Sequence, residues 1–376
     1  MRYPEFLKKN GRIGFIAPSF GCATEPYKTR FLKSLEAFRA AGYETVLGPN
    51  AFACEGIGIS NTPEKCAGEA NDFFLNDRSD VIISCGGGEL MCETLNYMNF
   101  DKIAQAAPKW FMGYSDNTNF TFLLNTLCDT AAIYGPCAGA FMSREDMLAG
   151  YTSAVCGGGT LQNLCTKKPE EIKEIADTMF LMGRNALRLI SGEELSVKNY
   201  DKWFEEHTVH EEVERIDFTA HEYKQYLYHG DKAVKSLDFS GRLLGGCLDC
   251  LANIVGTKFD KVREFTEKYK NDGIIWFLES CELNVMSQAR AYWNLANAGW
   301  FENVKAFIIG RPLMFDDTFD AFDHYKAALH MLSKYNVPII MDADIGHLDP
   351  AMPLISGAYA QVKAEDNSLS ITHVLT

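Results

Sequence analysis

Residues 111–124, FMGYSDNTNFTFLL, join an apolar run to a helix-like run through a short polar turn. The letters KWFMGY predict a strand that ends at Gly113 or Tyr114, and side chains of the types that cap a helix follow at once. In open parallel sheets, ligands bind beyond the carboxyl ends of the strands, where loops lead into helices. Ser115 stands at such a place, so this stretch indicates both a fold class and a candidate site.

The same alternation extends through residues 1–165. Short apolar runs such as RIGFIAP, DVIISC and AAIYGP are separated by amphipathic segments such as FLKSLEAFRAAG. This pattern predicts βαβ units and a parallel sheet whose apolar strands are covered on both faces. We therefore expect an α/β fold with an N-terminal domain over residues 1–165.

The rest of the chain divides into two segments. Residues 166–235 are charged and aromatic without a βαβ rhythm, which predicts a linker and an inserted excursion. The alternation resumes over residues 236–376, which predicts a second α/β domain. Its end holds two alternating runs around Asp366 and Asn367, a pattern typical of a β-hairpin.

The composition indicates a folded protein of enzyme size, with 376 residues of which 47% are hydrophobic and 23% charged. The net charge of −14 repels phosphate backbones, so nucleic acid is not an expected partner. The N-terminus has no long apolar segment after a basic start, and no run approaches the length of a membrane span. We therefore expect a cytoplasmic protein that does not engage membranes.

The spacing of the cysteines and of the paired histidines does not predict a metal-binding site. Twelve cysteines in a long chain without a secretory signal predict reduced thiols. Cys247 and Cys250 form the only CxxC motif, and two packed thiols are the better interpretation because no second motif completes a zinc site. His207 and His210 could place two ligands on one helix face, but a solvated acidic helix is the better interpretation. The sequence predicts no cofactor.

Ser115 lies where its hydroxyl is expected beside free backbone N–H donors, which suits a nucleophile. Asn117 stands where the G-x-S-x-G elbow has its second glycine, so on local pattern alone an ordinary helix cap is the better interpretation. A serine nucleophile needs a base. His347 follows the apolar run VPIIMDADIG, whereas His324 and His330 lie in a helical stretch. His347 is therefore the preferred base, with an ordinary loop histidine as the alternative.

Glu279 ends the apolar run GIIWFLES and so also falls at a predicted strand end. A carboxylate there is costly to bury unless a partner such as an imidazole N–H uses its charge. Glu282 and Asp344 are rival carboxylates for that role. The agreement of three signals at strand ends favours a triad in which Glu279 orients the base.

The segment SCGGGEL, residues 84–90, places glycines directly after the predicted strand DVIISC. Gly86, Gly87 and Gly88 let the backbone approach a substrate oxygen closely, as one half of an oxyanion hole. No GxGxxG or GxxxxGK[ST] motif is present, so a phosphate cradle is not predicted. An ordinary loop is the alternative.

In order along the chain, GGGEL, GYSDNT, FLESCE, FIIGRP and DIGHLDPAMPLISGA resemble the motifs of the LD-carboxypeptidase family of serine peptidases, which includes the microcin immunity proteins. The resemblance covers nearly the whole chain apart from the inserted segment. It implies a flavodoxin-like N-terminal domain joined to a smaller C-terminal α/β domain, with the active site between them. It also implies a homodimer and chemistry that needs no metal.

Carried over to this sequence, the resemblance implies Ser115 as the nucleophile, His347 as the base and Glu279 as the residue that fixes the imidazole. Ser115 would attack an amide carbonyl, and water would release the acyl-enzyme. The implied oxyanion donors are the backbone N–H groups of Asp116 and of Gly86 or Gly87. Family members usually show an arginine and a tyrosine around the glycine pair, where this chain has Cys85 and Gly88.

The resemblance implies two competing substrates. The first expectation is a murein tetrapeptide that loses its terminal D-alanine, and the alternative is an amide joining an aspartyl residue to a nucleotide analogue. The segment GEELSVKNYDKWFEE is similar to the tryptophan-bearing loop of the microcin-immunity branch, where Trp203 could stack on a base. A packed tryptophan is the alternative for Trp203. Outside the enzyme class, a non-catalytic peptide-binding protein on the same scaffold is the rival.

Overall fold

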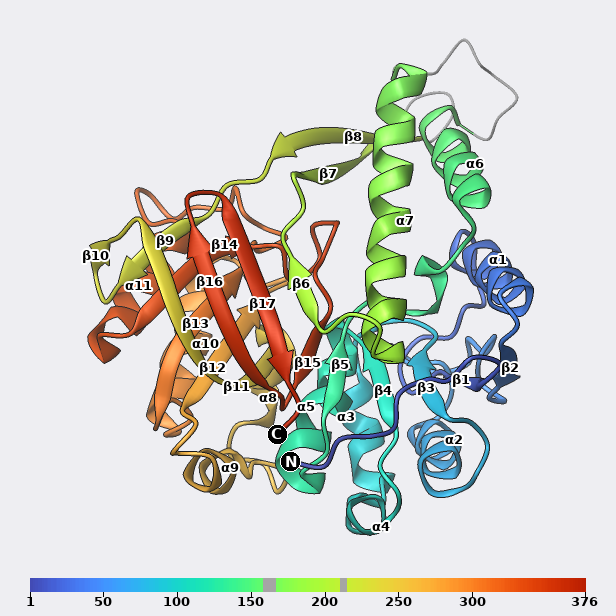
Figure 1. The fold of residues 1–376 in the computed structure, drawn as a ribbon, viewed down its shortest axis with the longest axis horizontal. Coiled ribbons are helices and arrows are strands. Elements are labelled where there is room, and N and C mark those ends of the chain that lie inside the picture. The colour runs from blue at the N-terminus through green and yellow to red at the C-terminus, as the bar shows by residue number, and fades with distance from the viewer. Residues whose placement is uncertain (158–166, 210–214) are drawn as a thin grey trace.

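The computed structural model describes residues 1–157, 167–209 and 215–376. Within these residues the strands form a six-stranded sheet, a nine-stranded sheet and a two-stranded ribbon (Figure 1). No helix of the described part is long and apolar enough to cross a membrane. The α-helices are α1 (Tyr27–Ala40), α2 (Pro63–Leu75), α3 (Met91–Thr94), α4 (Phe100–Gln105), α5 (Thr118–Cys128), α6 (Arg144–Val155), α7 (Pro169–Ser191), α8 (Leu248–Ile254), α9 (Val262–Lys268), α10 (Val285–Asn297) and α11 (His324–Leu332).

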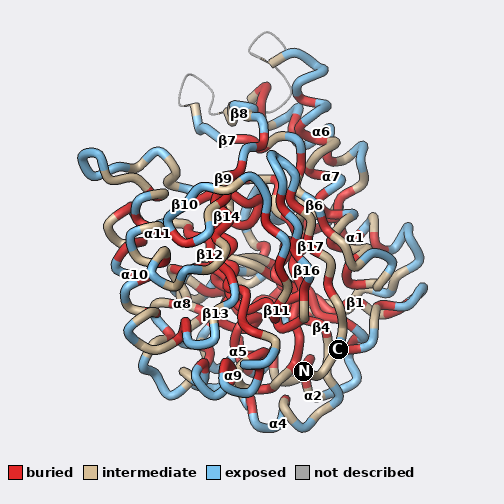
Figure 2. Tube along the Cα trace, turned by 60° about the vertical axis from the view of Figure 1, so that its left-hand side comes forward, coloured by how far each residue is buried: buried red, intermediate tan, exposed pale blue. Residues whose placement is uncertain are grey.

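The first sheet consists of β1 (Arg12–Ile16), β2 (Glu44–Leu47), β3 (Val81–Ser84), β4 (Trp110–Gly113), β5 (Ala132–Tyr134) and β15 (Leu354–Ser356). Its order is β15-β5-β4-β3-β1-β2, and β1 to β5 are parallel, which is the flavodoxin-like arrangement. Ile82 and Ile83 on β3 belong to different apolar clusters because successive side chains point to opposite faces. Every residue of β3 and β4 is buried, so the predicted parallel sheet with both faces of its central strands covered is confirmed. Figure 2 colours the trace of β4 as buried.

The second sheet consists of β6 (Ser196–Lys198), β9 (Tyr226–His229), β10 (Lys232–Ala233), β11 (Ser236–Cys247), β12 (Ile274–Glu279), β13 (Val304–Gly310), β14 (Pro338–Ala343), β16 (Tyr359–Glu365) and β17 (Ser368–Val374). Its order is β10-β9-β14-β13-β12-β11-β16-β17-β6, with β11 to β14 parallel at its centre. The remaining strands pair in antiparallel fashion. β16 and β17 form the predicted hairpin around Asp366 and Asn367.

The segment that follows the first sheet contains the long helix α7, which stands beside α6 in Figure 1. It also contains β7 (Lys202–Val209) and β8 (Arg215–Glu222), which pair as a separate ribbon. The helix expected around His207 is therefore wrong, because His207 lies in β7 opposite Asp217; His210 lies outside the described residues. The division into 1–165, 166–235 and 236–376 stays a prediction, since β6, β9 and β10 join the second sheet and β15 joins the first.

An aromatic stack links the two sheets below the candidate site. Phe122 on α5 stacks on Trp300 with ring centroids 5.2 Å apart, and Trp300 stacks on Trp276 of β12 at 5.8 Å. All three side chains are fully buried. Burying side chains of this size contributes strongly to stability, so α5 is fixed against the second sheet. The turn that carries Ser115 immediately precedes this helix.

Candidate active site

Ser115 opens the tight turn between β4 and α5. Its φ of 62° lies in the left-handed region, which costs a residue other than glycine about 1–2 kcal/mol. The Asn117 side-chain amide donates hydrogen bonds to the carbonyls of Gly86 at 2.8 Å and of Tyr114 at 3.0 Å. Asparagine thus ties the serine turn to the glycine turn, which gives it a structural role where the elbow pattern has glycine.

Ser115, His347 and Glu279 form a hydrogen-bonded series. Ser115 Oγ lies 2.8 Å from His347 Nε2, and His347 Nδ1 lies 2.9 Å from Glu279 Oε2. The Glu279 side chain is fully buried, whereas 12% of the His347 side chain is exposed. The neutral imidazole that donates from Nδ1 to the carboxylate leaves Nε2 free to accept the Ser115 proton. The structure therefore brings together the three residues singled out at separate strand ends.

The charges of His347 and Glu279 stabilise one another. Burial alone would lower the pKa of His347, but the charge and hydrogen bond of Glu279, together with Cys281, outweigh burial and raise the pKa well above its usual value. Burial likewise opposes ionisation of Glu279, and the His347 charge, with hydrogen bonds from His347 and Tyr134, lowers the pKa of Glu279 below its usual value. Glu279 therefore stays ionised, and it favours proton uptake by His347.

Tyr134 is a further member of the site. It lies at the carboxyl end of β5, where its hydroxyl donates to Glu279 Oε1 at 2.5 Å and accepts from the Ser115 backbone N–H at 3.2 Å. One side chain thus contacts both the nucleophile's backbone and the orienting carboxylate. Tyr134 was not among the residues predicted from the sequence, although the run AAIYGP also ends a strand, the same signal that Ser115, Glu279 and His347 carry.

The glycine turn lies directly against the nucleophile. A Cβ on Gly87 would stand 3.2 Å from Ser115 Cβ and 3.4 Å from Ser115 Oγ, so any side chain there would press on the serine. The Asp116 carboxylate is buried and accepts from Ser19 Oγ at 2.5 Å and from Met91 N at 2.9 Å. Asp116 therefore anchors the turn through its side chain, while Gly86 accepts from Asn117.

The rival carboxylates have other partners. Asp344 accepts from Tyr200 N at 2.8 Å and from Arg311 Nη2 at 3.2 Å, and burial raises its pKa to about 7. Glu282 is exposed, and its backbone N–H donates to Asp249. Glu279 is the carboxylate that contacts His347.

Trp203 is not part of the cavity wall beside the triad. Its ring stacks on His221 at 4.0 Å, and the Arg311 guanidinium lies over the ring at 4.4 Å. Only 7% of Trp203 is exposed. The indole is buried against these two partners, so a base could stack on it only if a neighbouring side chain moved. A role for Trp203 in substrate binding stays a prediction.

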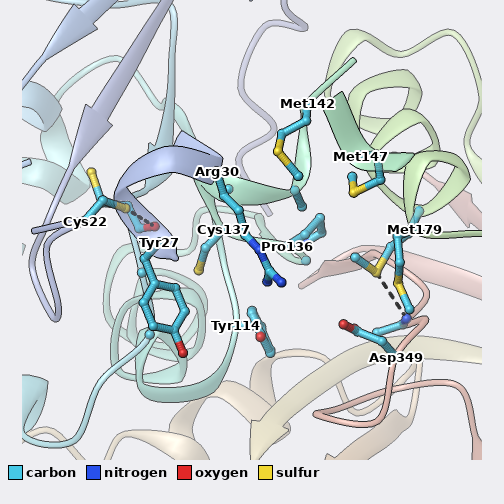
Figure 3. Close-up of a pocket in the computed structure, with 18 of the residues that line it drawn as sticks. Cys22, Tyr27, Arg30, Tyr114, Pro136, Cys137, Met142, Met147, Met179 and Asp349 are labelled. Carbon is cyan, nitrogen blue, oxygen red and sulfur yellow. Dashed lines mark hydrogen bonds between the residues drawn. The ribbon is translucent and has the colours of Figure 1, made fainter. Parts of the chain in front are cut away.

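A cavity of about 170 Å³ lies beside the triad, bounded by the glycine turn, Tyr114, Tyr134 and the residue before His347. Methionine, tyrosine and glycine residues make most of its wall, contributed by the first sheet's loops and by α1, α6 and α7. Figure 3 shows Arg30 extending into this space, with Tyr114 and Asp349 on the facing side. Apolar walls with few charged groups are typical of a small-molecule binding site.

A second cavity also has Ser115 in its wall, and it is lined by acidic side chains and thiols rather than by apolar side chains. Its wall includes the carboxylates of Glu89, Asp249 and Glu282 and the thiols of Cys247 and Cys250. Burial and the neighbouring carboxylates raise the pKa of Glu89. No lysine or arginine belongs to the described wall, so this side of the nucleophile carries a negative potential.

The CxxC cysteines are free thiols in this second cavity. Cys250 Sγ lies 3.7 Å from the Ser115 carbonyl, so the pair packs under the serine turn. Within the described ranges, no group of three or more His, Cys, Asp or Glu side chains could hold a metal ion.

Comparison with known proteins identifies relatives along the whole chain. Residues 13–135 match the model of the LD-carboxypeptidase N-terminal domain, and residues 240–362 match that of the C-terminal domain. Microcin C7 self-immunity protein MccF of Escherichia coli is 22% identical over 96% of this chain and 92% of its own length. A candidate carboxypeptidase of Vibrio cholerae is 23% identical over 99% of this chain and 98% of its own.

Solved structures share the fold. MccF in complex with glutamyl sulfamoyl guanosine matches with a TM-score of 0.72 at 20% identity and covers 99% of both chains. An MccF-like protein from Bacillus anthracis matches with a TM-score of 0.74 at 18% identity over 100% of both chains. The two-sheet architecture that holds the three side chains is therefore common to these proteins.

Proposed function

The chain belongs to the LD-carboxypeptidase family of serine peptidases, and we propose that it cleaves an amide bond by way of a Ser115–His347–Glu279 triad. The observation that carries the proposal is the pair of contacts of 2.8 Å and 2.9 Å that links the three side chains. These lengths lie within the hydrogen-bond reach required of a nucleophile, its base and the base's orienting group.

In the proposed reaction, His347 removes the Ser115 proton as Oγ attacks the amide carbonyl carbon. The backbone N–H groups of Asp116 and Gly87 hold the oxyanion; contact between Gly87 and Ser115 favours Gly87 over Gly86 for this role. His347 then protonates the leaving amine, and the C–N bond breaks to give an acyl-enzyme. Water, deprotonated by His347, attacks the ester and releases the acid.

For the substrate we propose a murein tetrapeptide that loses its terminal D-alanine. The family membership supports this reaction class, and the burial of Trp203 against His221 and Arg311 argues against the nucleotide alternative. The second candidate is the amide of an aspartyl nucleotide analogue. It is favoured by the match to MccF over most of the chain, a protein solved in complex with aspartyl sulfamoyl adenosine.

The experiment is turnover of both substrates, followed by mass spectrometry, with Ser115→Ala as the control. Release of D-alanine from the tetrapeptide that is lost in Ser115→Ala supports the main proposal. Cleavage of aspartyl sulfamoyl adenosine alone replaces it with the second candidate. Turnover of neither substrate overturns both and favours the non-catalytic peptide-binding protein.

A further inference from the structure

The cavity beside the triad contains two opposite charges in a largely apolar wall. Arg30 enters it from α1, and Asp349 enters it two residues after His347 in the chain. The rest of the wall is mainly methionine, tyrosine and glycine. Charged groups in such surroundings are costly unless they are paired. Figure 3 shows the two side chains reaching into the same space from different elements.

Arg30 and Asp349 are not paired with one another. No ion pair or side-chain hydrogen bond joins either of them to another described residue, and Arg30 contacts the Tyr151 ring at 5.8 Å. They are nonetheless close enough to interact: burial raises the pKa of Asp349 to about 6, and the Arg30 charge opposes that rise. A gap between an unpaired cation and an unpaired anion is the arrangement that accepts a group carrying both charges.

The charges around Ser115 indicate on which side of the nucleophile a substrate carboxylate is favoured. The second cavity at Ser115 is lined by Glu89, Asp249 and Glu282 and repels a carboxylate. Arg30 supplies the cation of the first cavity, so a carboxylate on the substrate is favoured on that side. Gly87 and Tyr114 connect this cavity to the nucleophile, which places any group bound there next to the scissile amide.

We propose that Arg30 and Asp349 form a subsite for a zwitterionic amino-acid group, in which Arg30 binds the carboxylate and Asp349 binds the ammonium. The proposal rests on the proposed hydrolase function and specifies its substrate class. Both candidate substrates carry such a group on the residue whose carbonyl is attacked: the far end of a diaminopimelyl residue, or the amino group and side-chain carboxylate of an aspartyl residue. Arg30 and Asp349 are thus specificity residues that act on substrate charge.

The test removes one charge at a time from the substrate and from the protein. Three tetrapeptides are compared: the parent with meso-diaminopimelate, its distal N-acetyl derivative and its distal carboxamide. We expect wild-type kcat/KM to fall roughly 10- to 100-fold for each derivative, as for loss of a charge-assisted hydrogen bond. Arg30→Met should cleave the parent and the carboxamide equally while still discriminating against the acetyl derivative. Asp349→Asn should show the reverse pattern.

Matched surface variants control for general effects. Arg184→Met and Asp316→Asn remove the same charges at exposed positions and should keep the wild-type ranking of the three peptides. A uniform loss in Arg30→Met and Asp349→Asn across all three peptides would overturn the subsite, and so would equal cleavage of the three peptides by wild type. In either case the proposed hydrolase function would stand.

Binding separates the subsite from the reaction. Calorimetry with free meso-diaminopimelate and L-aspartate should show binding to the wild type that is lost in both Arg30→Met and Asp349→Asn. If no peptide is cleaved but this binding pattern holds, the subsite stands and the proposed function fails. Absence of both turnover and charge-dependent binding overturns both proposals.

Discussion

Tyr134 holds the same carboxylate that contacts the imidazole: its hydroxyl donates to Glu279 Oε1 while His347 contacts Oε2. The same hydroxyl accepts from the backbone N–H of Ser115. Strand β5 of the first sheet thereby fixes a glutamate on β12 of the second. The relative position of nucleophile and base depends on this contact between the sheets.

Replacing Tyr134 by phenylalanine should lower kcat with little change in KM. The variant loses the donor to Glu279 and the acceptor for Ser115 N–H, and removal of one such positioning hydrogen bond costs roughly tenfold in rate. Steady-state kinetics on the cleaved substrate measures this. Tyr292→Phe, a buried tyrosine on α10, is the matched control and should keep wild-type kinetics. An unchanged kcat in Tyr134→Phe would remove Tyr134 from the site.

Glycine at position 115 should give a more stable protein than alanine, by about 1 kcal/mol, because glycine adopts the positive φ without strain. Both variants should lose at least about 10³-fold in turnover, since neither has a nucleophile. Denaturant unfolding measures the difference in stability. At Ser287, inside helix α10, the order should reverse, with alanine more stable than glycine. The same order at both positions would contradict the strained turn.

The rate should rise with pH through the ionisation of His347. Glu279 raises the pKa of His347, so the neutral base forms only at higher pH and the acid limb of kcat/KM is displaced upward. Glu279→Gln removes the charge that raises this pKa, and its residual activity should have an acid limb at lower pH. Its kcat should also fall by roughly 10⁴-fold because the imidazole loses its orienting carboxylate. A pH–rate profile in which the limb does not move would show that another group controls it.

Trp203→Phe should change KM for aspartyl sulfamoyl adenosine by less than about twofold, because His221 and Arg311 already cover the indole. Trp203→Ala should instead lower the free energy of unfolding by about 3–5 kcal/mol, as expected for truncation of a buried aromatic side chain. Kinetics and denaturant unfolding measure the two effects. A KM that rises tenfold or more in Trp203→Phe would restore the base-stacking role.

The sequence predicted the candidate site best where a functional side chain directly follows an apolar strand. Ser115, Glu279 and His347 each follow such a run, and their convergence is a property of parallel sheets that a linear pattern can indicate. Tyr134 follows the same rule but looked like an ordinary apolar residue. Arg30 could not be found in this way, because it lies on a helix whose orientation toward the cavity is set by packing.

In the region around Trp203, by contrast, the secondary structure could not be predicted from the sequence. Its charged and aromatic letters gave no clear period, so His207 was expected on a helix although it belongs to a ribbon. Pairing between β7 and β8 joins residues 6 to 20 positions apart, and such cross-strand contacts are not reported by the propensity of single residues. β6 and β9 join the second sheet through β17 and β14, partners far along the chain that a local pattern cannot indicate.

The late position of strand β15 in the chain determines when the candidate site can form during protein synthesis. The nucleophile is translated 232 positions before its base, and β15, which follows His347, must return to pair with β5 of the first sheet. A chain that has been translated only as far as β5 therefore contains Ser115 but lacks His347, Glu279 and the last strand of the first sheet. The proposed triad is complete only after residue 347 has been added, so the candidate site cannot form in a fragment that lacks the last strands.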